Sequence, residues 1–277
     1  MSTHSKPFSV FLDDFSSFLS SAATTSPSPP VTPPDFSVFT PTSESEVHKI
    51  LYNCPDKQSD SDPIPTWLLK ECSSIVVPTI TNIVNLSLTT GQFHPILKES
   101  IISPVLKKPT LDKEELSTYR PISNLSLISK IIEHVVKSRL TDHLTSNSLL
   151  NSHQSAYCKH HSTETALLYI HDHLVSAIGI QKVSCLCLLD LSAAFDTIDH
   201  DNLITRLSSW FGIHGSVLSW FKSYLSSCPF RVKCVTDLSS WHTSSCSVPQ
   251  GSVLGPLLFV MYTTPLSRDV KREPEKR

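Results

Sequence analysis

The sequence predicts an α+β fold that is rich in helices and contains a small sheet. Three observations support this class: apolar residues recur every three or four positions between 125 and 140, a mostly apolar run covers 183–191, and residues 230–235 mostly alternate apolar and polar side chains. These patterns are typical of an amphipathic helix, a buried strand and a half-buried strand, in that order. With 277 residues and 39% hydrophobic content, the chain can bury a substantial core.

The N-terminal 35 residues are predicted to hold little stable structure. Four phenylalanines recur at helical spacing between residues 8 and 18, which predicts a short amphipathic helix at most. The segment SPSPPVTPPD, residues 26–35, is rich in proline, which cannot continue a helix and favours an extended linker. We therefore expect ordered structure to begin after residue 35.

Residues 36–99 are predicted to form a helical N-terminal extension. Ser43 and Glu46 have the spacing of a capping box, which predicts the start of a helix. Trp67 begins an apolar stretch that is predicted to end at Gly91, because glycine readily adopts the left-handed conformation common at helix C-termini.

The rest of the chain mixes short strands with amphipathic helices. Residues 100–106 predict a strand that delivers Lys107 and Lys108 into a turn. In chain order, the remaining predicted elements are a helix at 125–140, a helix at 162–177 with Ser162 or Thr163 as its N-cap and with Leu167, Leu168 and Leu174 facing inward, the strand at 183–191, helices at 203–211 and 217–225, the strand at 230–235, a turn that leads into an apolar helix within 246–266, and a disordered charged tail at 267–277.

Composition and charge exclude several classes of protein. The net charge of −2 argues against nucleic-acid binding by bulk attraction, although residues 95–160 carry nine Lys or Arg against six Asp or Glu. No run of about 18 apolar residues predicts a membrane span. Two acids, Asp13 and Asp14, interrupt the start of the chain where a signal peptide needs apolar residues. We therefore expect a soluble, intracellular protein with no membrane contact.

The eight cysteines are scattered along the chain, and the only close pair is Cys185 and Cys187. We expect reduced, packed thiols rather than a metal site or disulfides. The spacing of the thirteen histidines matches no zinc pattern.

The stretch CLLDLSAAFDTIDHDNL, residues 187–203, places Asp190 at the end of the predicted buried strand. A buried carboxylate needs a partner, and Mg²⁺ prefers carboxylates together with phosphate oxygens, so Asp190 is a candidate metal ligand. Phe195 follows three small residues and could close the space beside C2′ of a nucleotide sugar, or it could be a core residue. Asp196 and Asp199 are more simply explained as helix N-cap or turn residues.

Within this stretch, DLSAAFDTIDH resembles the first catalytic motif of reverse transcriptases from non-LTR, LINE-type retrotransposons. Other segments resemble the family's blocks in the same order, so that the resemblance extends over residues 36–266. These segments are SDPIPTWLLK at 61–70, the stretch from LKKPT to KSRL at 106–140, NSHQSAYCKHHSTETAL at 151–167 and VPQGSVLGPLLFVMYTTPL at 248–266.

The resemblance implies a right-hand polymerase fold with a small antiparallel sheet, in which 100–182 form the fingers and 183–266 part of the palm. It implies an RNA-directed DNA polymerase that uses an RNA template, a DNA primer, deoxynucleoside triphosphates and Mg²⁺ bound by Asp190.

The resemblance also implies the roles of individual side chains. Phe195 corresponds to an aromatic gate that selects the sugar, and Gln250 and Gly251 belong to a Pro-Gln-Gly turn that touches the incoming nucleotide and the template. Arg120 corresponds to an arginine that grips the triphosphate, a role suited to a permanently charged fork. Lys107 is a candidate phosphate contact, with a solvated turn as the alternative.

The sequence departs from the family in two places. Ala156, Tyr157 and Cys158 stand where Gly-Phe-Arg is expected, and the charged tail follows where the family has a hairpin with an aromatic, Ala, Asp, Asp sequence. The expected consequence is a truncated polymerase that is inactive alone. The alternatives are a module that binds RNA or template–primer without catalysis and a non-functional translated fragment.

Overall fold

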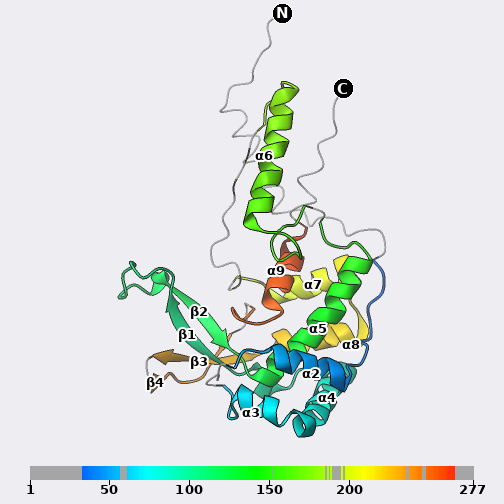
Figure 1. Ribbon diagram of the computed structural model, residues 1–277, viewed down its shortest axis with the longest axis vertical. Helices are drawn as coiled ribbons and strands as arrows, with labels where there is room; N and C mark the ends of the chain where they lie inside the picture. The colour runs from blue at the N-terminus through cyan, green and yellow to red at the C-terminus, as the bar shows by residue number, and fades with distance from the viewer. Residues whose placement is uncertain are drawn as a thin grey trace, which may run out of the picture.

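The computed structural model describes residues 33–56, 61–151, 153–184, 197–234, 237–244 and 248–265, together with Leu186, Leu188 and Phe195. A small sheet lies at one side of a helical body (Figure 1). The predicted α+β class is confirmed at this level. The predicted N-terminal helix and the charged tail lie outside the described residues.

The sheet has the strand order β2-β1-β3-β4, and β5 also pairs with β3. β1 is antiparallel to β2 but parallel to β3, whose Phe230 lies opposite Ser100. The prediction of a small antiparallel sheet is therefore confirmed for three of the four strand pairs and wrong for β1 and β3, because the chain returns to β1 after a long helical crossover, the usual connection between parallel strands. The strands are β1 (Ser100–Leu106), β2 (Tyr119–Asn124), β3 (Cys228–Cys234), β4 (Asp237–Leu238) and β5 (His242–Ser244).

β2 was not predicted as a strand, and its proline explains why. Pro121 lies opposite Pro104 of β1, so neither residue can donate a backbone hydrogen bond at this point of the ladder. Such a strand is tolerated at a sheet edge, which is where β2 lies in the described sheet. Beyond the prolines, the hairpin is closed by the N–H of Lys107, which donates to the carbonyl of Thr118 at 2.9 Å.

Most of the predicted helices are present. α4 ends as predicted at Gly91, which has a φ of 65° and accepts no side chain, since a Cβ there would lie 2.7 Å from the carbonyl oxygen of Ser216. The helices before the long loop to α6 are α2 (Glu44–Asn53), α3 (Thr66–Glu71), α4 (Ser73–Thr90) and α5 (Leu127–Ser146), with short 3-10 turns η1 (Pro95–Lys98) and η2 (Leu116–Thr118). The later helices are α6 (Thr163–Gly179), α7 (His200–Phe211), α8 (Gly215–Leu225) and α9 (Gly255–Thr263).

One hydrophobic core joins the N-terminal helices to the rest of the described chain. Its centre is Trp220 of α8, which is fully buried and donates its indole N–H to Ser87 of α4 at 3.0 Å. Phe39 and Phe93 contact the same indole edge to face, at centroid distances of 6.0 and 5.4 Å. The buried cluster therefore includes side chains of α2, α4, α5, α7, α8 and α9.

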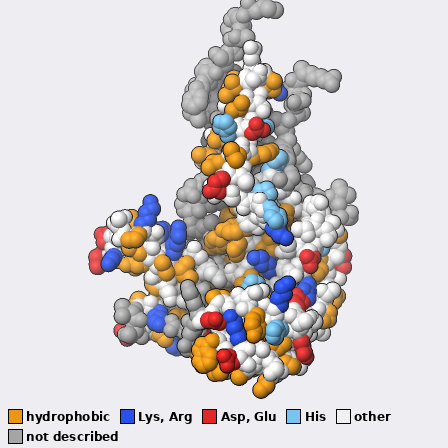
Figure 2. Space-filling model, viewed as in Figure 1, with side chains coloured by type: hydrophobic (Ala, Val, Ile, Leu, Met, Phe, Trp, Pro, Cys, Tyr) orange, Lys and Arg blue, Asp and Glu red, His pale blue; other side chains and the backbone are white. Residues whose placement is uncertain are grey.

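The prediction that three leucines of α6 face inward is wrong for Leu167 and Leu168, whereas Leu174 is half-buried. Leu167 and Leu168 are 60% and 67% exposed, and no residue of α6 is buried. The helix begins at its predicted cap, Ser162, but it projects away from the helical body (Figure 1), and apolar side chains line its surface (Figure 2). A helix can keep its amphipathic pattern without a neighbour to pack against, because the hydrogen bonds of its backbone are local.

The predicted buried strand at 183–191 is also not found among its described residues. Val183 and Leu188 are 100% and 81% exposed, and no described strand pairs with the segment. An apolar sequence alone cannot form a strand, since a strand needs a partner for its backbone groups.

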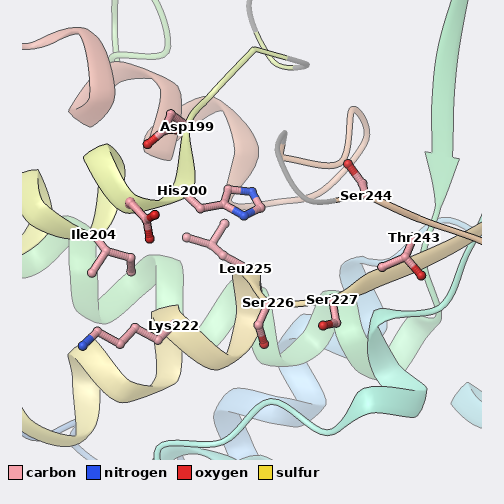
Figure 3. Close-up of a pocket in the computed structure, with 10 residues that line it drawn as sticks. Asp199, His200, Ile204, Lys222, Leu225, Ser226, Ser227, Thr243 and Ser244 are labelled. Atoms are coloured by element: carbon pink, nitrogen blue, oxygen red, sulfur yellow. The ribbon is translucent and has the colours of Figure 1, made fainter.

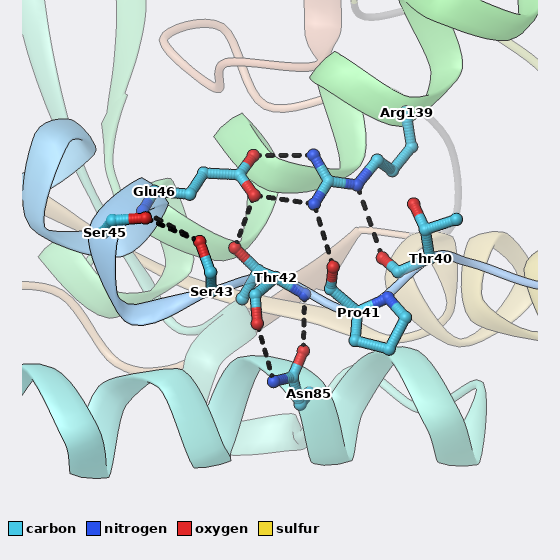
Figure 4. Close-up of polar contacts among 8 residues, drawn as sticks. All are labelled: Thr40, Pro41, Thr42, Ser43, Ser45, Glu46, Asn85 and Arg139. Carbon is cyan, nitrogen blue, oxygen red and sulfur yellow. Dashed lines mark hydrogen bonds and ion pairs between the residues drawn. The ribbon is translucent and has the colours of Figure 1, made fainter.

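Arg139 joins the N-terminal extension to α5 through a two-pronged ion pair with Glu46 (Figure 4). Both N···O distances are 2.6 Å, and the guanidinium also donates to the carbonyl oxygens of Thr40 and Pro41. The predicted capping box is thus only half formed: Ser43 accepts from the N–H of Glu46, but the Glu46 carboxylate turns to Arg139 instead.

We expect Arg139→Met to lower the free energy of unfolding by about 1–3 kcal/mol, because it leaves the carboxylate of Glu46 without its charged partner. Arg139 holds the pKa of Glu46 below its ordinary value, so the pair stabilises the fold above that value and the contribution is lost as pH falls through the lowered pKa. Urea denaturation from pH 7 to 3 measures both effects. Ser138→Ala, at an exposed site on the same helix, should change neither.

Candidate functional site

The turn that contains Gln250 and Gly251 lies directly against β2. The N–H of Ser123 donates to the carbonyl oxygen of Gln250 at 2.7 Å. Gly251 has a φ of 118°, and a Cβ there would lie 2.7 Å from the carbonyl oxygen of Ser123. Both the backbone conformation and the lack of space require glycine, so this residue allows the turn to approach the strand.

Glu133 of α5 holds the residues that follow the turn. Its Oε2 accepts hydrogen bonds from the N–H groups of Val253 and Leu254, and its Oε1 accepts from the hydroxyl of Tyr224 at 3.1 Å. The side chain is fully buried, and this burial raises the pKa of Glu133 to about 7, although the hydrogen bonds oppose the rise. Glu133 was not among the predicted site residues. The signal that could have found it is an acid on the apolar face of the predicted helix at 125–140.

Phe195 lies on the loop before α7 and is tied to the same turn. Its carbonyl oxygen accepts from the N–H of Val248 at 3.0 Å, and its ring packs on Phe259 of α9 at a centroid distance of 5.3 Å. Asp199, nearby on this loop, caps α7 by accepting from the N–H of Asn202, which confirms its predicted role as an N-cap.

Arg120 and Lys107 lie on the β1–β2 hairpin, and both are exposed. Arg120 is on β2, opposite Val105 and three residues before Ser123, so the strand that holds the turn also carries this guanidinium. The ammonium group of Lys107 donates to the carbonyl oxygen of Ser117 within the hairpin at 2.8 Å. Figure 2 shows basic side chains on this hairpin, with acidic ones near its tip.

Asp190, the predicted metal ligand, and Asp196 lie outside the described residues. Within the described ranges, no three His, Cys, Asp or Glu side chains are grouped as a metal site would require. The described cysteines are free thiols: Cys54, Cys72, Cys158 and Cys228 are half-buried, and Cys234 is exposed, unlike the packed thiols that were predicted. Cys185, Cys187 and Cys246 are not among the described residues.

An open hollow of about 440 Å³ lies where the start of α7 meets the end of α8 and β5 (Figure 3). Figure 3 shows the ring of His200 between Asp199 and the strand that carries Thr243, while Lys222 extends away from that ring. None of the predicted site residues that the structure describes lines this hollow. The described predicted residues lie in three other places: the turn at Gln250 and Gly251, the loop at Phe195 and the β1–β2 hairpin.

The family model described as reverse transcriptase (RNA-dependent DNA polymerase) matches residues 105–276, which include Lys107, β2, the loop of Phe195 and the turn at Gln250. The chain belongs to the reverse transcriptase family. The predicted resemblance to reverse transcriptases of non-LTR retrotransposons is confirmed, because the curated relatives are named as RNA-directed DNA polymerases of mobile elements. Polymerases of this family generally use a divalent metal.

The relatives include two transposon polymerases from Drosophila melanogaster. The probable RNA-directed DNA polymerase from transposon BS is 33% identical over 63% of this chain, and that from transposon X-element is 29% identical over 84%. The RNA-directed DNA polymerase from mobile element jockey of Drosophila funebris is 26% identical over 65% of the chain. This chain spans only 19 to 25% of the length of these relatives. Among its described residues, no helix is both long and apolar enough to span a membrane.

Proposed function

We propose that this chain contains the fingers and part of the palm of an RNA-directed DNA polymerase from a mobile element. It binds an RNA template, a DNA primer and deoxynucleoside triphosphates. The observation that carries the proposal is the packing of the Gln250–Gly251 turn on the strand that presents Arg120, with the loop of Phe195 bonded to the start of the same turn.

In the proposed site, Arg120 grips the triphosphate, because its guanidinium can donate two parallel hydrogen bonds to phosphate oxygens. The ring of Phe195 excludes a 2′-hydroxyl and thus selects deoxynucleotides. Gln250 and Gly251 place backbone groups beside the nucleotide. Lys107 adds a phosphate contact if its ammonium group leaves the Ser117 carbonyl. Asp190 would hold Mg²⁺, which neutralises charge during phosphoryl transfer when bound.

We expect Arg120→Ala to weaken the binding of a deoxynucleoside triphosphate by about 10-fold or more, since a charge-assisted hydrogen bond contributes about 1.5–3 kcal/mol. Calorimetric titration with Mg²⁺ and an annealed RNA template and DNA primer measures the effect. Lys113→Ala removes an equal charge from the same hairpin and serves as the matched control. Equal losses in the two variants would show that only bulk charge matters and would contradict a site at Arg120.

A second candidate function is binding of RNA or template–primer without catalysis. The observation that favours it is the group of exposed cations on the β1–β2 hairpin, within the region of local positive charge. Primer extension separates the candidates: synthesis that Asp190→Ala abolishes supports the polymerase and contradicts the prediction that the chain is inactive alone. Binding that weakens steeply with salt, in a chain that extends no primer, supports the binding module.

A further inference from the structure

Glu133 lies where three helices meet, next to the predicted nucleotide-binding turn. The two N–H groups that its Oε2 accepts from belong to Val253 and to Leu254, the N-cap of α9. Backbone N–H groups at a helix N-terminus lack partners within the helix, and the positive end of the helix dipole favours an anion there. A buried carboxylate at this point therefore fixes both the start of α9 and the turn before it.

Two further hydrogen bonds help to hold Glu133 and the residues after the turn in place. Tyr224 of α8 donates its hydroxyl to Oε1 of Glu133, and the hydroxyl of Ser252 accepts from the N–H of Gly255 at 2.9 Å. On the other side of the turn, the carbonyl oxygen of Gln250 accepts a hydrogen bond from the N–H of Ser123 in β2. The four residues from Gln250 to Val253 are thus held at both ends, and Glu133 provides a charged group at the downstream end.

We propose that Glu133 is a positioning residue of the nucleotide site: its ionised carboxylate fixes the Pro-Gln-Gly turn, so that nucleotide affinity depends on the charge of this side chain. The inference rests on the proposed function, because that function makes the turn a nucleotide contact. Loss of the charge weakens the two hydrogen bonds to Val253 and Leu254, since an ionised acceptor forms stronger bonds than a neutral one.

The environment of Glu133 makes its charge sensitive to pH near neutrality. Burial raises its pKa to about 7, so the carboxylate is ionised above this value and protonated below it. The other titratable groups that face it are Tyr224 of α8, Cys228 of β3, Lys98 of η1 and Lys130 of α5 itself. Burial raises the pKa of Tyr224 and of Cys228, so both remain neutral in this range.

The first test is nucleotide titration from pH 6 to 8 with the full chain, Mg²⁺ and annealed template–primer. We expect wild-type affinity to rise about 10-fold across this range. Glu133→Gln should bind the nucleotide weakly. Its affinity should change with pH only through the nucleotide itself, whose terminal phosphate titrates at about 6. Ser129→Ala removes another buried bond of α5, to the carbonyl of Leu97, and should keep the wild-type dependence. The same pH profile in Glu133→Gln and wild type would overturn the proposal.

The second test is hydrogen exchange at the amides of Val253 and Leu254, which does not depend on nucleotide binding. We expect about 10-fold less protection in Glu133→Gln, and in the wild type a loss of protection as pH falls through about 7, after correction for the intrinsic exchange rate. Glu133→Asp keeps the charge and should therefore retain part of the amide protection and part of its dependence on pH. This variant also tests the proposal if Glu133→Gln does not fold. Unchanged protection would overturn the proposal. A wild-type chain that binds no nucleotide would overturn the proposed function, and the exchange would still show whether Glu133 holds the turn.

Discussion

Trp220→Ala should lower the free energy of unfolding by about 3–5 kcal/mol, the range for removing a large aromatic side chain from a packed core. The indole is fully buried between Phe39, Phe93 and Tyr224, and its ring stacks on that of Tyr224 at a centroid distance of 5.2 Å. Its replacement also leaves the hydroxyl of Ser87 without its indole donor. Because total stability is about 5–15 kcal/mol in most domains, this loss is a large fraction of it.

Circular dichroism during urea denaturation measures the effect without relying on tryptophan fluorescence. Trp67→Ala is the matched control, since it removes the same side chain from a site that is 53% exposed and should cost less than about 1 kcal/mol. A single cooperative transition in the wild type is also expected, because the N-terminal helices and α8 share one core. Similar losses in both variants, or a broad non-cooperative transition, would contradict this description of the core.

Gly251→Ala should displace the Gln250 turn from β2 and weaken the proposed nucleotide binding. The backbone of Gly251 has a φ of 118°, which L-residues rarely adopt, and the new Cβ would lie 2.7 Å from the carbonyl oxygen of Ser123. Strain of this kind costs about 1–3 kcal/mol. We expect a corresponding loss of stability in thermal or urea denaturation, and at least a 10-fold loss of nucleotide affinity if the turn contacts the nucleotide as proposed.

Gly179→Ala is the control for this substitution. Gly179 ends α6, where an added Cβ meets no atom within 4 Å, so alanine there should be neutral or stabilise by about 0.4–1 kcal/mol. Wild-type affinity and stability in Gly251→Ala would contradict the tight approach of the turn to β2. A loss of stability with unchanged affinity would separate the fold of the turn from its proposed role.

Features that depend on local interactions could be predicted from the sequence. The end of α4 at Gly91, the cap of α6 at Ser162 and the N-cap role of Asp199 follow from backbone preferences and from bonds within a few residues. The resemblance of the DLSAAFDTIDH stretch and the later blocks to reverse transcriptases likewise needed no coordinates. The assigned roles of Arg120, Phe195 and the other site residues stay predictions.

Features that depend on distant partners could not be predicted in this way. The parallel pairing of β1 with β3 joins residues about 130 positions apart in the chain, as the pair Ser100 and Phe230 shows. The exposure of Leu167 and Val183 contradicts the apolar pattern of their segments, since burial requires a neighbour and not only a suitable side chain.

The sequence by itself determined the family, the helix-rich class and the identity of the turn at Gln250 and Gly251, because each is encoded in contiguous residues. Only the tertiary structure placed Ser123 against that turn and brought the carboxylate of Glu133 into contact with the backbone that follows it. The physical reason is that hydrogen bonds and desolvation depend on distance in space, and Glu133 lies 120 residues from Val253 along the chain.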